Sequence, residues 1–332
     1  MKAYILDRYG KGQKLRLGDV ADPVAGPGEV LVEIRAAALN VLDVKIRDGA
    51  FKPILRYRPP FVLGHDLAGV VVAIGAGVTR FQIGDEVFAR PRDYHIGTFA
   101  QRIAVKDADV AQKPSSMSMA QAASLPLVAL TAWQVLIDAA NVKPGDKVMI
   151  HAGSGGVGTI AIQLAKYLGA TVATTTSSRN VDLVRSLGAD VVIDYKSQKF
   201  EDVLSEYDLV LSSLEDGSLE RSLGVLKPGG KLISISGPPD VQFARSQGMN
   251  WLMQQVMRLL SLSIRRKAAR HRVNYSFVFM HADGAQLSQI AALVDEGVIG
   301  PIVDRTFAFD ALNDAMDYIA TGRARGKVVI TF

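Results

Sequence analysis

One segment near the middle of the chain restricts the possible folds more than any other. The apolar run Lys147–His151 leads into Gly153-Ser154-Gly155-Gly156-Val157-Gly158, and helix-forming residues follow as far as Leu168. Gly153, Gly155 and Gly158 have the G-x-G-x-x-G spacing, which indicates a dinucleotide site when it lies between a strand and a helix. The first glycine permits a tight turn, the second lets the backbone approach a pyrophosphate, and the third lets helix and strand pack closely.

Strands and helices alternate after this segment. We expect strands at Thr171–Thr176, Val191–Asp194, Tyr207–Ser212 and Lys231–Ser236, and helices at Val157–Leu168, Val181–Leu187 and Leu219–Leu226. Such alternation predicts a parallel sheet with helices on both faces. It favours a dinucleotide-binding fold over the alternative, an isolated glycine-rich turn.

The first third of the chain has a different pattern. Short apolar stretches at Val30–Ile34, Ala68–Ile74 and Glu86–Phe88 are separated by turns rich in Gly and Pro, which predicts a partly open barrel of antiparallel strands. The length of 332 residues favours two domains. We therefore expect an α/β protein, with a β-rich domain at residues 1–122 that is completed by 297–332, and a nucleotide-binding domain at 123–296.

Composition excludes several kinds of site. The chain has no cysteine, which rules out disulfides, thiolate catalysis and cysteine-based zinc or iron–sulfur centres. The net charge is +5, but the cations are spread along the sequence and form no single stripe, so we expect no nucleic-acid partner. No apolar run reaches the roughly 20 residues of a membrane span, and the N-terminus lacks the features of a signal peptide. A cytoplasmic protein is therefore expected.

The strand expected at Thr171–Thr176 bears on the choice of cofactor. NAD-binding folds carry an acid about 20 residues after the glycines, but this strand continues into Ser177-Ser178-Arg179 and the next acid is Asp182. Hydroxyls and a guanidinium bind a 2′-phosphate that a carboxylate would repel. NADPH is therefore the expected cofactor, with Tyr195 packing on its phosphate or adenine. Helix N-caps for the serines and a solvated charge for the arginine are the alternatives.

Six segments spread over the chain carry a recognisable combination of residues. They are Ala36–Lys45, Pro60–Gly69, Gly84–Val87, Leu125–Trp133, His151–Gly158 and Leu187–Asp190. Together they resemble the zinc-free quinone oxidoreductase branch of the medium-chain dehydrogenase/reductase superfamily, within it the group that includes enone reductases. The resemblance implies a GroES-like catalytic domain interrupted by a Rossmann domain. It also implies NADPH-dependent reduction of a small apolar quinone or α,β-unsaturated carbonyl compound, and it suggests a homodimer.

The resemblance further implies which residues contact the cofactor and the substrate. The cofactor-binding candidates are Thr131, Gly153, Ser154, Gly155, Gly156, Val157, Gly158, Ser177, Ser178, Arg179, Tyr195, Leu214, Gly237, Phe277, Phe279 and Lys327. Asn40 is expected beside the nicotinamide with Thr131. Asp43 and Lys45 complete the catalytic candidates, because a lysine held by a carboxylate can supply charge or a proton to an enolate. A surface ion pair is the alternative for these two.

His65 and Asp66 raise the question of a metal. Zinc alcohol dehydrogenases of the same superfamily have Cys where Asn40 stands and Gly-His-Glu where Gly64-His65-Asp66 stands. Because a catalytic zinc normally needs three protein ligands and the thiolates are absent, we expect no metal and a structural hydrogen bond at His65. A zinc alcohol dehydrogenase is kept as the least favoured alternative.

The stretch Met249–Ile264 is the least family-like part of the chain. It predicts an apolar helix rich in Met and Leu, and the basic cluster Arg265–Arg272 follows. The helix is open to three interpretations: packing in the core, covering a substrate site or a second subunit, or resting on a membrane surface. Phe51 stands where related enoyl-thioester reductases carry a Tyr acid. These two features motivate an alternative function, a non-enzymatic NADPH-binding regulatory or membrane-associated protein.

Overall fold

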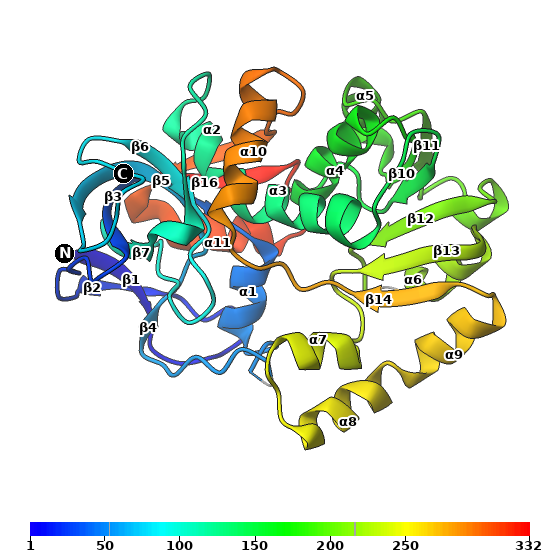
Figure 1. Ribbon diagram of the computed structural model, residues 1–332, viewed down its shortest axis with the longest axis horizontal. Coiled ribbons are helices and arrows are strands. Elements are labelled where there is room, and N and C mark those ends of the chain that lie inside the picture. The colour runs from blue at the N-terminus through cyan, green and yellow to red at the C-terminus, as the bar shows by residue number, and fades with distance from the viewer. Residues whose placement is uncertain (53, 216) are drawn as a thin grey trace. The chain divides into compact units, whose positions relative to one another are not determined.

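The computed structural model describes residues 1–52, 54–215 and 217–332. It divides into two compact units, one formed by Met1–Leu130 with His281–Phe332 and the other by Thr131–Met280 (Figure 1). The α/β fold predicted from the sequence, a β-rich part and a Rossmann-like parallel sheet, is confirmed.

The first unit is built on a seven-stranded sheet in the order β15-β16-β3-β5-β6-β8, with β7 also paired to β3. Its strands are β3 (Glu29–Leu39), β5 (Asp66–Ile74), β6 (Glu86–Ala89), β7 (Arg102–Lys106), β8 (Val110–Gln112), β15 (Val303–Ala308) and β16 (Lys327–Thr331). A three-stranded sheet consists of β1 (Lys2–Leu6), β2 (Arg16–Asp19) and β4 (Phe61–Val62). Its helices include α1 (Val41–Asp48), α2 (Met119–Ala123), α10 (Gly284–Asp295) and α11 (Leu312–Ala320), and α3 (Pro126–Trp133) begins in this unit and ends in the second.

The helix α10 belongs to the first unit, whereas the sequence boundaries placed it with the nucleotide-binding domain. Its N-terminus packs against β8 so closely that a Cβ on Gly284 would lie 2.4 Å from the carbonyl oxygen of Val110. At its other end the Asp295 carboxylate accepts hydrogen bonds from the backbone amides of Ser115 and Ser116, at 3.1 and 2.9 Å. These contacts join segments that are about 180 residues apart in the chain, so local patterns do not predict them.

The second unit is a six-stranded parallel sheet in the order β11-β10-β9-β12-β13-β14. Its strands are β9 (Lys147–Ile150), β10 (Thr171–Thr176), β11 (Val191–Asp194), β12 (Tyr207–Ser212), β13 (Leu226–Ser234) and β14 (Asn274–Phe277). Its helices include α4 (Gly156–Tyr167), α5 (Val181–Ser186), α6 (Ser218–Arg221) and α7 (Val241–Ser246). Because all six strands run in one direction, the residues that follow them gather at one edge of the sheet.

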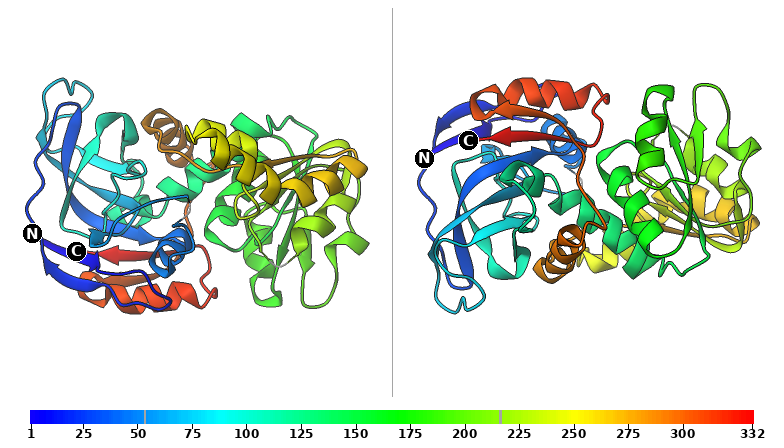
Figure 2. Two further views of the ribbon diagram at one scale, coloured as in Figure 1. Left: turned by 90° about the horizontal axis from the view of Figure 1, so that it is seen from below. Right: turned by 90° about the horizontal axis from the view of Figure 1, so that it is seen from above.

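The expected helix Met249–Ile264 is two helices, α8 (Trp251–Leu260) and α9 (Leu262–Arg270) (Figure 2). Asn250 caps α8 by accepting a hydrogen bond from the backbone N–H of Met253. Ser261 ends it, and its hydroxyl donates to the carbonyl of Met257. The prediction of one helix was therefore wrong, because a small polar residue inside the apolar run bonds back to the preceding turn. The basic cluster lies largely on α9 itself.

Candidate functional site

The glycine turn joins β9 to α4 in the second unit. A Cβ on Gly158 would lie 2.4 Å from the carbonyl oxygen of Ala152, and one on Gly153 would lie 2.1 Å from Thr174 Oγ1. Neither position therefore has room for a side chain. These contacts are the close strand–helix packing that the sequence spacing predicts.

The middle of the turn is open. A Cβ on Gly155, the N-cap of α4, would meet only the carbonyl of Ala152, at 3.3 Å. Among the described residues no side chain caps this helix, and its first turn contains no acid. Uncapped N–H groups and the positive end of the helix dipole suit a pyrophosphate. The hydroxyl of Ser154 is held by the Thr176 hydroxyl at 3.0 Å and by Asn180 Nδ2 at 2.9 Å.

The segment after β10 carries the residues predicted to bind the 2′-phosphate. Ser177 is buried, whereas Arg179 and Tyr195 are exposed. Ser178 donates its hydroxyl hydrogen to Asp194 Oδ2 at 2.5 Å, and this hydrogen bond holds the pKa of Asp194 below its usual value. Asp194 was not expected here, because the sequence pattern places no acid directly after β10. Asp194 ends the neighbouring strand β11, where it is the register partner of Thr176.

The remaining cofactor candidates of this unit follow the other strands. Leu214 comes after β12, Gly237 after β13, and Phe277 ends β14. The parallel sheet places these three at the same edge as the glycine turn. Phe277 and Phe279 both pack edge-on against Phe243, with ring centroids 5.2 and 5.5 Å away. Thr131 is buried and lies within α3.

Five polar side chains form a buried network in the first unit. Its members are Asn40, Asp43, His65, Asp66 and Lys327, none more than 5% exposed. Asp43, in the first turn of α1, accepts a hydrogen bond from the backbone N–H of Asn40 at 2.8 Å through Oδ2. Its Oδ1 lies 2.7 Å from Nδ1 of His65. Burial of this kind is tolerated only when the polar groups satisfy one another.

Lys327 sits at the centre of this network. Its ammonium donates to Asn40 Oδ1 and, at 3.0 Å, to Asp66 Oδ2. Asp66 also accepts from Asn40 Nδ2 at 2.9 Å and from the backbone N–H of Leu127 at 2.8 Å. Lys327, a cofactor-binding candidate from the resemblance, therefore neutralises a buried carboxylate in this structure. The sequence of β16 did not predict this role, because the partners of Lys327 are distant in the chain.

The predicted Asp43–Lys45 pair stays a prediction, and the described hydrogen bonds of Asp43 are made to other residues. Both carboxylate oxygens of Asp43 bind other members of the network. Residues two apart on a helix project in different directions, and Lys45 is only partly buried on α1. The structural hydrogen bond expected of His65 is present, as its contact with Asp43 shows.

Comparisons with known proteins fit this architecture. Residues 26–115 match the alcohol dehydrogenase GroES-like domain family, and residues 187–330 match the zinc-binding dehydrogenase family. The mitochondrial NAD(P)H oxidoreductase RTN4IP1 of Mus musculus is 34% identical over 99% of this chain and 89% of its own length. The 2-methylene-furan-3-one reductase of Solanum lycopersicum is 35% identical over 99% of this chain and 79% of its own length.

The chain belongs to the medium-chain dehydrogenase/reductase superfamily. The resemblance found from its motifs is thereby confirmed. Among solved structures, the quinone oxidoreductase from Coxiella burnetii superimposes on this superfamily member with a TM-score of 0.87 at 30% identity, covering 100% of this chain and 99% of that one. An alcohol dehydrogenase superfamily protein from Novosphingobium aromaticivorans gives 0.84 at 35% identity, covering 100% and 99%.

The second matching family is a zinc-binding one, so the metal-binding capacity of this medium-chain dehydrogenase/reductase bears on its chemistry. No group of three or more His, Cys, Asp or Glu side chains suited to a metal occurs within residues 1–52, 54–215 and 217–332. In the buried network, the ammonium of Lys327 is already bound to the carboxylate of Asp66. The positive charge of this ammonium would repel a Zn²⁺ ion at the same place, so these residues do not fit a zinc ion.

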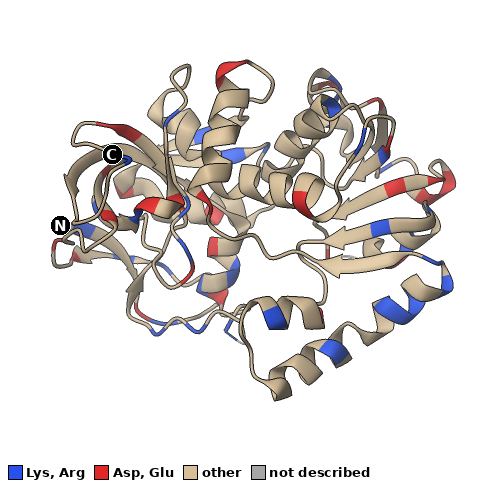
Figure 3. Ribbon diagram, viewed as in Figure 1, with Lys and Arg blue, Asp and Glu red and all other residues tan. Residues whose placement is uncertain are grey.

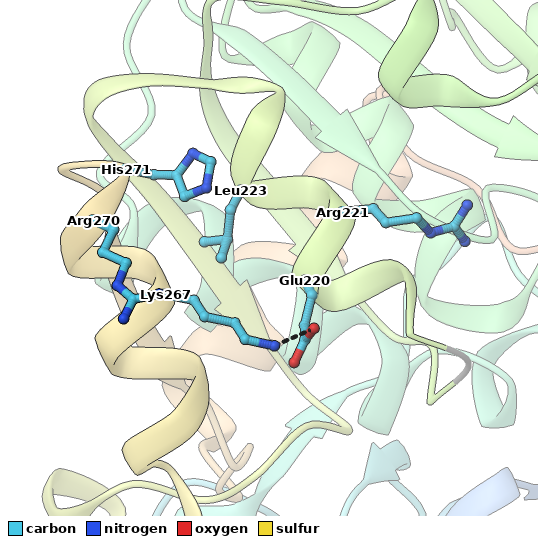
Figure 4. Close-up of a pocket in the computed structure, with 6 residues that line it drawn as sticks. All are labelled: Glu220, Arg221, Leu223, Lys267, Arg270 and His271. Atoms are coloured by element: carbon cyan, nitrogen blue, oxygen red, sulfur yellow. Dashed lines mark ion pairs between the residues drawn. The ribbon is translucent and has the colours of Figure 1, made fainter.

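The second unit also has a shallow groove of about 280 Å³, which is separate from the glycine turn (Figure 4). Lys267 and Glu220 point toward each other there and form an ion pair of 2.5 Å, whereas Arg221 points away. His271 lines the groove shortly before β14 begins. The groove is therefore at the amino edge of the parallel sheet, opposite the edge that carries the glycine turn, and it is not the cofactor site.

Proposed function

We propose that this chain is an NADPH-dependent reductase that transfers a hydride to quinones or α,β-unsaturated carbonyl compounds without zinc. The observation that carries the proposal is the open, uncapped glycine turn at the start of α4. Membership of an oxidoreductase superfamily supports a nicotinamide cofactor. The similar proteins include an NAD(P)H oxidoreductase, a 2-methylene-furan-3-one reductase and a quinone oxidoreductase, and these support the proposed acceptors.

The second unit would hold the cofactor. Backbone N–H groups of Ser154–Val157 would bind its pyrophosphate, since a helix N-terminus favours anions. Ser177, Arg179 and Tyr195 would bind the 2′-phosphate. The nearby Asp194 carboxylate is already satisfied by the Ser178 hydroxyl and by the backbone N–H of Lys196, at 3.0 Å. Those hydrogen bonds stabilise Asp194 as an anion, so the proposal relies on the positive charge of Arg179 to offset it beside the 2′-phosphate.

The first unit would supply the polar groups that act on the substrate. NADPH supplies the hydride when bound, and the chain must orient the acceptor and stabilise the enolate that forms. Asn40 is fixed at both ends of its amide, by Asp66 and by Lys327, so it is a rigid positioning group. Nε2 of His65 has no hydrogen-bond partner among the described residues. We propose that it exchanges the proton that follows hydride transfer, while Asp43 holds the ring at Nδ1.

Zinc independence rests on the charge of the network. Replacing the ligand thiolate with Asn40 and placing the Lys327 ammonium against Asp66 gives this site its own fixed cation. We also retain a cytoplasmic location and a homodimer as parts of the proposal. Subcellular fractionation and sedimentation velocity test these two points.

The test is an NADPH-consumption screen over quinones, enones and enals, run beside NADH and on chelator-treated protein. The proposal predicts turnover of compounds such as 1,4-benzoquinone that survives the chelator. Activity that appears only after zinc is added would replace it with the alcohol dehydrogenase alternative. NADPH binding without turnover of any acceptor would favour the non-enzymatic alternative.

A further inference from the structure

The outer face of α8 is apolar and exposed. Its exposed side chains are Trp251 at 71%, Leu252 at 63%, Val256 at 39%, Leu259 at 68% and Leu260 at 55%. At roughly 100° per residue, all five fall within about half of the helix circumference. Met257, on the opposite side, is buried and attaches the helix to its unit. Five large apolar side chains on one helix face exceed the scattered exposure that is ordinary on a protein surface.

The outer face of α9 is cationic. Ile264 and Ala268 are buried, which fixes the inward side of this helix. Arg266 and Arg270 lie about 180° and 220° around the axis from the mean of these two residues, so they project outward, and both are exposed. Figure 3 shows Lys and Arg gathered on α9, whereas α8 is mostly uncharged. Residues 241–272 contain no Asp or Glu at all.

We infer that α8 and α9 together form a docking surface for an anionic phospholipid membrane. An amphipathic segment with Trp and Leu on one part and Arg on the other lies in the plane of a bilayer interface. The apolar face of α8 would enter the boundary between headgroups and acyl chains. The arginines of α9 would contact anionic headgroups, which attract basic segments beside the membrane. No helix in the part of the chain that the structure describes is long and apolar enough to span a membrane, so the attachment would be peripheral.

The charge of the α8–α9 surface favours a membrane over a second copy of the chain as its binding partner. A two-fold contact pairs a surface with itself, and residues 241–272 offer the arginines no carboxylate. Glu220, on α6, is already paired with Lys267. A self-contact through α8 and α9 would therefore leave the cations without an opposite charge. An anionic bilayer supplies both apolar depth and negative charge, and so complements the whole surface.

The experiment is co-sedimentation of the full chain with vesicles of phosphatidylcholine alone or mixed with phosphatidylglycerol. We expect binding to the mixed vesicles that is at least about tenfold stronger than to the neutral ones. The binding weakens at about 0.5 M salt, where screening shortens the reach of the charges to a few Å. Trp251 gives a second readout, because the only other tryptophan, Trp133, is buried. Its emission should shift to shorter wavelength with mixed vesicles.

Two double variants separate the two parts of the surface. Leu252→Ser with Leu259→Ser should abolish the emission shift, and Arg266→Glu with Arg270→Glu should abolish the preference for anionic vesicles. Two matched controls should bind like the unmodified chain: Ile83→Ser with Val203→Ser, which alters exposed apolar residues elsewhere, and Lys11→Glu with Arg185→Glu, which makes the same charge change.

Circular dichroism melting verifies that each variant folds. Equal binding to neutral and anionic vesicles, or no binding, overturns the inference. A change in oligomeric state of the leucine variant in sedimentation velocity, without vesicle binding by the unmodified chain, would assign α8 to a subunit contact. None of these outcomes depends on NADPH turnover, so none of them bears on the proposed reductase function.

Discussion

The glycine turn and the buried network differ in how far their polar groups are satisfied within the protein. The turn keeps its backbone amides uncapped by side chains and its middle open, which suits the anion that we propose it binds. The network encloses two carboxylates, an imidazole, an amide and an ammonium that satisfy one another. Affinity for a ligand comes from polar groups that are left unsatisfied, whereas rigidity comes from polar groups that are fully paired. Nε2 of His65 is an exception within the network, because it has no hydrogen-bond partner among the described residues.

The largest expected effect comes from breaking the network at its cation. Lys327→Met leaves Asp66 buried without its ammonium, which costs about 3–5 kcal/mol of unfolding free energy. Urea unfolding measures the loss. Lys2→Met is the control, because the Lys2–Asp19 pair is exposed and contributes at most about 1 kcal/mol. Similar losses in the two variants would show that the network does not hold the first unit together.

Adding a side chain at Gly158, in the glycine turn, should have the next largest effect. Gly158→Ala places a methyl group 2.4 Å from the carbonyl of Ala152, which costs about 1–3 kcal/mol by overpacking. It should also weaken NADPH binding, because α4 must move away from the strand. Gly224→Ala is the control, since a Cβ there meets nothing within 4 Å. Unchanged binding and stability in Gly158→Ala would contradict the role given to this turn.

A smaller effect is expected at the edge of the same unit. Arg179→Ala should raise the dissociation constant for NADPH about tenfold, because one charge-assisted contact to the 2′-phosphate is lost. The constant for NADH should not change. Arg185→Ala, an exposed arginine on α5, should alter neither. Equal weakening of both cofactors in Arg179→Ala would show that this arginine does not recognise the phosphate.

The smallest effect concerns Asp295, which resembles the network but lies at the surface. Hydrogen bonds from the backbone N–H and hydroxyl of Ser116 lower the pKa of this carboxyl from 3.8 to about 2. A carboxyl with a lowered pKa in the folded state stabilises the fold above its unfolded pKa, and that stability is lost as the pH falls through the folded value. Asp295→Asn should therefore flatten the stability curve between about pH 4 and pH 2, measured by thermal melting. An unchanged acid limb would contradict this.

The same comparison explains what the sequence could predict. The glycine turn and the strands around it are local, so residue spacing predicts them. The network joins Asn40 to Lys327 across 287 positions, and no local pattern indicates that pairing. Asp194 was missed for a related reason, because it reaches Ser178 from the adjacent strand of the sheet. The break at Ser261 shows that an apolar run predicts a helix better than it predicts where the helix ends.

The central claim is that the open turn of the second unit binds NADPH. Isothermal titration calorimetry of the purified chain with NADPH, and then with NADH, tests it most directly. We expect saturable one-to-one binding of NADPH and at least about tenfold weaker binding of NADH. Absence of NADPH binding, or tighter binding of NADH, would contradict it.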